Sequence, residues 1–170
     1  RAARLGPEHL DTAIARAELA EMLDIVDRFD EAEPLYREAL RGFELRLGPL
    51  DPRVARVRVQ LAGLLDRMSR PSEAEPLFLT AIEVQRRVLG ERHPELGDTY
   101  YYYADLLSRS ERYSEAQAGY EAALEIFEVP RLDRAYALRE LAINLVELGR
   151  HDEAAARFEE AIALFREFAG

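Results

Sequence analysis

The side chains best suited to molecular recognition are four consecutive tyrosines, residues 100–103, followed by further tyrosine and arginine residues. In a helix, Tyr100 and Tyr103 would face a core, while Tyr101 and Tyr102 would face the other way. Tyrosine and arginine dominate the energetic centres of protein interfaces. We therefore expect Tyr101 and Tyr102 to be central contacts with a partner.

Other residue types could support catalysis or metal binding, but their patterns favour neither. Glu18, Glu21 and Asp105 would need a closed, desolvated pocket to separate their pKa values for acid–base work. His9 and His93 lie 84 residues apart at equivalent places, which indicates helix caps or linkers. The chain has no cysteine, glycine-rich phosphate loop, nucleophile elbow or zinc-ligand spacing. We expect no enzymatic activity, no cofactor and no metal.

Composition and charge narrow the class of partner. The 170 residues carry a net charge of −10, which disfavours nucleic acid and favours basic or neutral partners. No apolar run approaches the roughly 20 residues of a membrane span, and no signal peptide is evident. We expect a cytoplasmic protein that binds neither membrane nor nucleic acid. All 23 basic residues are arginine, a bias typical of GC-rich bacteria.

The elements that position these side chains repeat along the chain. Near-identical stretches begin at residues 30, 72, 114 and 152, at spacings of 42, 42 and 38 residues. Such a period predicts an all-α fold, a right-handed α-solenoid of antiparallel helix pairs. We expect a single array over residues 1–170. It would comprise the end of a preceding repeat and four further units: 1–6, then about 7–48, 49–90, 91–130 and 131–170.

Each repeat is expected to contain two helices joined by a tight turn. One small or polar residue just before a glutamate is expected to cap each second helix: Asp30, Ser72, Ser114 and Asp152. Alanines 12 residues apart are expected to form the contact within each pair: Ala20 with Ala32, Ala62 with Ala74, Ala104 with Ala116, and Ala142 with Ala154. Four aromatic residues are expected to fill the space between repeats: Tyr36, Phe78, Tyr120 and Phe158.

These residues carry a family resemblance. The pattern Leu19-Ala20-x2-Leu23 followed by Ala32-x3-Tyr36-x2-Ala39 resembles the tetratricopeptide signature. The 42-residue period and the opening at residues 89–94, Leu-Gly-Glu-Arg-His-Pro, are similar to the variant found in kinesin light chains. The resemblance implies that the first helix of each repeat lines a concave groove.

The resemblance thereby assigns a set of partner-binding candidates on the groove side of the first helices. They are Glu18, Glu21, Arg56, Gln60, Arg67, Asp98, Tyr101, Tyr102, Asp105, Arg109, Tyr136, Arg139 and Glu140. The function it implies is a non-enzymatic scaffold that binds a peptide or helix of a protein partner, basic or aromatic-rich in character.

Two other functions remain open. The array could be an intramolecular regulatory spacer of a larger bacterial signalling protein, such as a kinase, a protease or a nucleotide-switch regulator. A sensor of signalling peptides is a third and lesser alternative. The last helix ends in apolar residues without a polar capping helix, Phe158, Ile162, Phe165 and Phe168. We expect that face to meet a further repeat or to self-associate with another chain.

Overall fold

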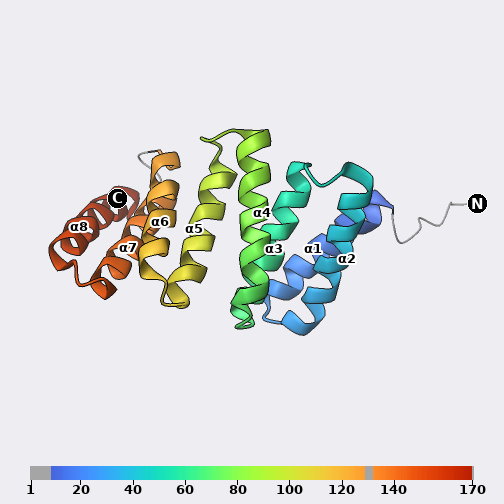
Figure 1. Cartoon of the computed structure of the whole chain (residues 1–170), viewed down its shortest axis with the longest axis horizontal. Coiled ribbons are helices and arrows are strands. Elements are labelled where there is room, and N and C mark those ends of the chain that lie inside the picture. The colour runs from blue at the N-terminus through green and yellow to red at the C-terminus, as the bar shows by residue number, and fades with distance from the viewer. Residues whose placement is uncertain (1–8, 129–131, 170) are drawn as a thin grey trace, which may run out of the picture. The chain divides into compact units, whose positions relative to one another are not determined.

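The computed structural model describes residues 9–128 and 132–169, and it divides into two compact units, Arg1–Leu89 and Gly90–Gly170. Over the described residues there are eight helices and no strand (Figure 1). In the first unit they are α1 (Leu10–Ile25), α2 (Phe29–Leu47), α3 (Pro52–Arg67) and α4 (Pro71–Leu89). In the second they are α5 (Pro94–Arg109), α6 (Tyr113–Ile126), α7 (Leu132–Glu147) and α8 (His151–Ala169).

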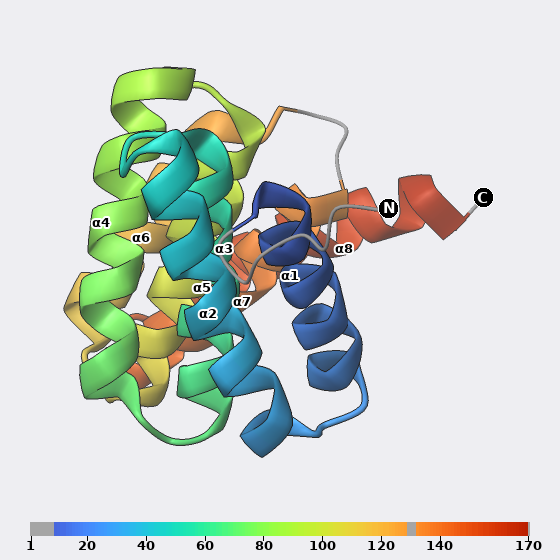
Figure 2. The same cartoon turned by 90° about the vertical axis from the view of Figure 1, so that its right-hand side faces the viewer.

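Within each unit, consecutive helices pack as pairs. Helix α1 packs on α2 and α3 on α4 in the first unit; α5 packs on α6 and α7 on α8 in the second. Both views show α1 running alongside α2 (Figures 1 and 2). The pairs are joined by further packing of α2 on α3 and of α6 on α7. The predicted fold class, an all-α solenoid of helix pairs, is confirmed.

Two expected boundaries lie outside the described residues. They are the tail of a preceding repeat at 1–6 and the junction of the last two units at 130 and 131. A single continuous array over both compact units stays a prediction. Among the described residues, none of the helices is both long and apolar enough to span a membrane.

The turn inside each repeat ends the first helix in the same way. The backbone N–H groups of Asp27 and Arg28 donate to the carbonyls of Asp24 and Leu23, at 3.2 and 2.9 Å. Asp27 has a φ of 58°, so this is a Schellman motif with its left-handed residue at Asp27. The corresponding left-handed positions in the other three repeats are Ser69, Glu111 and Gly149.

The predicted caps of the second helices are wrong by two residues. Asp30, Ser72, Ser114 and Asp152 lie in the first turn of their helices, where the backbone is already helical. The residue before each helix is an arginine: Arg28, Arg70, Arg112 and Arg150. Each guanidinium donates two hydrogen bonds of 2.6 to 2.9 Å to the glutamate three residues on, Glu31, Glu73, Glu115 and Glu153 respectively. This fork of two charged hydrogen bonds from arginine to glutamate thus takes the place of the expected side-chain cap.

Small residues bring the two helices of a pair close together. All eight alanines of the predicted pairs are at most 2% exposed, and Ala104 and Ala116 share one core cluster. Two glycines permit still closer approach: a Cβ on Gly42 would lie 2.8 Å from the Cβ of Ala13, and one on Gly119 would lie 2.9 Å from that of Ala104. Three of the four predicted aromatic fillers are 1% exposed, whereas Phe158 is only half-buried.

Candidate partner-binding face

A pocket in the second unit gathers four of the predicted binding residues. It has a volume of about 140 Å³ and is lined by Asp98, Tyr101, Tyr102, Phe127, Asp133 and Tyr136. Helix α5 supplies the first three, Phe127 ends α6, and α7 supplies the last two. Both α5 and α6 pack on α7, so three successive helices of the unit build one concave site.

The aromatic rings of this pocket differ in exposure. Tyr102 is 50% exposed and Tyr136 is 39% exposed, whereas Phe127 is almost completely buried. Tyr101 is half-buried, and its ring meets the rings of Tyr102 and Tyr120 edge to face at centroid distances of 5.5 and 6.0 Å. Tyr101 therefore serves as packing between the core and the pocket, while Tyr102 and Tyr136 offer accessible ring surface.

The potential at the pocket is negative. Burial raises the pKa of the Tyr102 hydroxyl, and the carboxylates of Asp98, Asp105 and Asp133 raise it further. Burial likewise raises the pKa of Tyr101, with Asp105 as the next contributor. A phenol loses its proton less readily when it is buried and when nearby charges are negative, so these shifts arise first from burial and then from the carboxylates around the rings.

Asp105 has a structural partner as well. The Tyr120 hydroxyl donates a 2.7 Å hydrogen bond to Asp105 Oδ1, and Tyr120 is 1% exposed. Burial raises the pKa of Tyr120, and the Asp105 charge and hydrogen bond raise it further. This bond ties α5 to α6 behind the pocket.

Two predicted contacts of α7 pair with each other beside Tyr136. Arg139 donates to Glu140 through Nε at 2.9 Å and also through Nη2. Its guanidinium carbon lies 5.2 Å from the centroid of the Tyr136 ring. The rings of Tyr136 and Phe165 meet edge to face, with their centroids 5.2 Å apart. The ring of Tyr136 thus already interacts with a guanidinium, a cation–π arrangement.

The remaining candidates do not join this pocket. Glu18, Glu21, Arg56 and Gln60 lie in the first unit, the first three exposed and Gln60 half-buried. Arg67 pairs with the buried Asp24 and stacks 5.1 Å from the centroid of the Phe29 ring, so intramolecular contacts hold it. Arg109 is exposed at the end of α5.

Two pocket residues were not among the predicted candidates. Phe127 had a sequence signal, because the residue 11 positions after the second-helix alanine is also aromatic at Phe43 and Phe165. Asp133 is the second residue of α7, where an acidic residue is ordinary for a first helical turn, so no pattern marked it.

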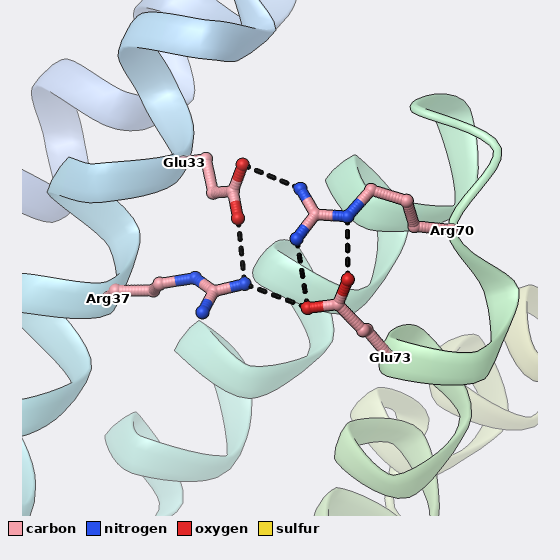
Figure 3. Close-up of polar contacts among 4 residues, drawn as sticks. All are labelled: Glu33, Arg37, Arg70 and Glu73. Carbon is pink, nitrogen blue, oxygen red and sulfur yellow. Dashed lines mark hydrogen bonds and ion pairs between the residues drawn. The ribbon is translucent and has the colours of Figure 1, made fainter.

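A second polar cluster lies in the first unit and links α2 to α4 (Figure 3). Glu33, Arg37, Arg70 and Glu73 form a ring of alternating charge. Arg70 Nη1 donates to Glu33 at 2.7 Å, and Arg37 Nη2 donates to Glu73 at 3.1 Å. Arg37 also pairs with Glu33, and Arg70 with Glu73, each at 2.7 Å. The hydrogen bonds from Arg70 and Arg37 lower the pKa of Glu73. Every arginine here has a carboxylate partner, so the ring stabilises the helix arrangement and offers no unpaired charge to a ligand.

Comparison with known families gives the class of protein. One tetratricopeptide repeat model matches residues 53–129, and another matches residues 12–52 and 134–168. Together they span nearly all the described helices. The chain belongs to the tetratricopeptide repeat family.

Solved structures show the same fold. BtubC (BKLC) from P. vanneervenii is 21% identical, with a TM-score of 0.89 over 99% of this chain and 68% of that one. A putative kinesin light chain with nearly identical TPR-like repeats from Podosopora anserina is 20% identical, with a TM-score of 0.82 over 94% and 77%. YrrB, a TPR protein with an unusual peptide-binding site, is 16% identical, with a TM-score of 0.66 over 89% and 68%. A search of curated protein sequences returns no match.

Proposed function

We propose that this protein is a non-enzymatic interaction scaffold that binds a segment of a protein partner on the α5–α7 face of its second unit. Tetratricopeptide repeats are generally non-catalytic and serve protein interaction, which supports the scaffold class. YrrB, which has a similar fold, is a TPR protein with an unusual peptide-binding site, and this supports a peptide-like ligand.

The observation that carries this proposal is the pocket itself. Accessible ring surface of Tyr102 and Tyr136 lies beside Asp98 and Asp133 in a concavity of about 140 Å³. Aromatic anchors in a concave setting are the usual centre of a protein-binding surface. We assign Asp105, Arg139 and Glu140 to the rim of the pocket, because all three act electrostatically on Tyr101.

The proposal predicts that peptides can be selected against this face. Random twelve-residue peptides displayed on phage would be panned on the full chain, and enriched peptides would be measured by calorimetry. Tyr102→Ala should weaken binding about tenfold or more, the range of an interface hot spot. Tyr102 is 50% exposed, so the variant should keep the melting temperature of the parent.

Glu18→Ala provides the matched control, because Glu18 is an exposed candidate at the position of the first unit that corresponds to Tyr102. It should leave binding unchanged. Failure to enrich any peptide, or equal binding by the parent and the Tyr102→Ala variant, would contradict the proposal.

A further inference from the structure

The pocket of the second unit combines two features that together select one kind of ligand. Its walls are aromatic, with Tyr101, Tyr102, Tyr136 and Phe127, and the charged lining residues within the described part of the chain are the carboxylates Asp98 and Asp133. Aromatic faces attract cations through the ring quadrupole, and carboxylates attract them through charge. A neutral apolar group would gain from the rings alone, and an anion would be repelled by the carboxylates and by the faces of the rings.

We infer that the pocket is a cage for an organic cation, namely the guanidinium or ammonium head of an arginine or lysine side chain from a protein partner. This inference rests on the proposed function and specifies the chemistry of the partner segment. The volume of about 140 Å³ fits such a head group. For comparison, an apolar cavity of about 150 Å³ holds a benzene molecule.

Two arginines of α7, Arg134 and Arg139, make contacts outside the cage. Arg134 donates through Nη1 to the carbonyl oxygens of Leu124 and Phe127, at 2.6 and 3.1 Å. Arg139 pairs with Glu140 and stacks on Tyr136. The stacking of Arg139 shows that a pocket ring accepts a guanidinium, and neither arginine lines the pocket.

The first unit provides an internal control. By the repeat register, the six pocket positions correspond there to Ile14, Ala17, Glu18, Phe43, Arg53 and Arg56. Those residues include one aromatic ring, two arginines and one glutamate, so the equivalent positions lack the four rings and two carboxylates that favour a cation in the second unit. Among these equivalent positions, the cage residues occur in the second unit, and they differ between units that share the same helix-pair arrangement.

The cage can be tested with small probes on the full chain. Tyrosine ring signals would be followed by aromatic ¹H–¹³C NMR at low salt while N-acetyl-arginine methylamide, N-acetyl-lysine methylamide or N-acetyl-citrulline methylamide is added. Citrulline has nearly the shape of arginine without its charge. We expect saturable shifts of the Tyr102 and Tyr136 signals with at least one cationic probe and none with citrulline; comparison of arginine with lysine identifies the preferred head group.

Variants separate the two sources of attraction. Tyr102→Leu keeps apolar volume but removes the ring face, and should weaken cation binding about two- to thirty-fold, whereas Tyr102→Phe should retain most of it. Asp98→Asn with Asp133→Asn should weaken it further and reduce its dependence on salt. Asp152→Asn with Glu159→Gln, which removes two exposed carboxylates of α8, is the charge-matched control and should change nothing. Circular dichroism would verify that each variant is folded.

Absence of a saturable shift with both cationic probes, or equal shifts with citrulline, would overturn the cage. The result of this cation titration is independent of the result of the peptide selection that tests the proposed function. Selected peptides that depend on Tyr102 but contain no required basic residue would keep the scaffold and refute the cage. Cation binding without any selectable peptide would keep the cage and contradict the scaffold.

Discussion

At the residue scale, the structure distinguishes tyrosines that the sequence could not. Four consecutive tyrosines in a helix must face different directions, and the helical period correctly predicted that Tyr102 is exposed. It did not predict that Tyr101 would be half-buried against Tyr120, because that depends on a ring from another helix. Which carboxylates gather around Tyr102 is also a tertiary fact, since Asp98 and Asp133 come from different helices.

The buried hydroxyl of Tyr120 allows a residue-scale prediction. Tyr120→Phe removes the 2.7 Å hydrogen bond to Asp105 and should lower the free energy of unfolding by about 1 kcal/mol. Urea denaturation followed by circular dichroism measures the change. Phe78 occupies the equivalent position and is 1% exposed, so the repeat accommodates a phenylalanine ring there. An unchanged denaturation midpoint would mean that water replaces the bond at no cost.

At the element scale, period and composition were sufficient to predict the helices, but not their starts. The residues expected as caps are good cap formers, yet the chain enters each second helix through an arginine that binds the third helical residue. The reason is the left-handed residue of the turn, Asp27 in the first repeat, which lies three positions before the expected cap. It ends the first helix, and the second helix begins two residues after it, so a single arginine lies between them. Asp27, Ser69 and Glu111 adopt the left-handed conformation although none of them is a glycine, so no residue type in the sequence indicated this motif.

This turn gives a prediction with its own control inside the chain. Glu111 adopts a φ of 60°, which is strained for a residue with a Cβ. Glu111→Gly should raise the free energy of unfolding by about 0.5 to 1 kcal/mol, the strain relieved less the extra entropy of glycine in the unfolded chain. Gly149 holds the same position in the last repeat with a φ of 73°, and Gly149→Ala should lower stability by about 1 kcal/mol.

Glu111→Ala distinguishes backbone strain from loss of the glutamate side chain. It keeps a Cβ in the left-handed position and should leave stability nearly unchanged. Thermal denaturation of the three variants and the parent measures the order of stabilities. Equal gains for Glu111→Gly and Glu111→Ala would show that the side chain, not the backbone conformation, was destabilising.

At the scale of the whole molecule, both units rely on carboxylates held in ionised form by arginine. Hydrogen bonds from Arg70 and Arg37 lower the pKa of Glu73, and those from Arg112 and Arg150 lower the pKa of Glu115 and Glu153. A carboxyl group whose pKa is lower in the folded state adds stability above its unfolded pKa, and that stability is lost as pH falls through the folded value. The repeated fork therefore predicts acid sensitivity in both units.

The measurable consequence is a loss of stability below about pH 4.5, the ordinary value for a glutamate. Chemical denaturation at pH 7, 5, 4 and 3 should give a midpoint that is nearly constant to pH 5 and then falls. Arg150→Gln removes the fork of the last repeat and should flatten part of this decline, because Glu153 would then titrate near its unfolded value. Added salt at pH 7 should reduce the benefit of the forks in the parent more than in this variant, because exposed ion pairs are screened. A decline with pH that is identical in parent and variant would assign the acid sensitivity to other carboxylates.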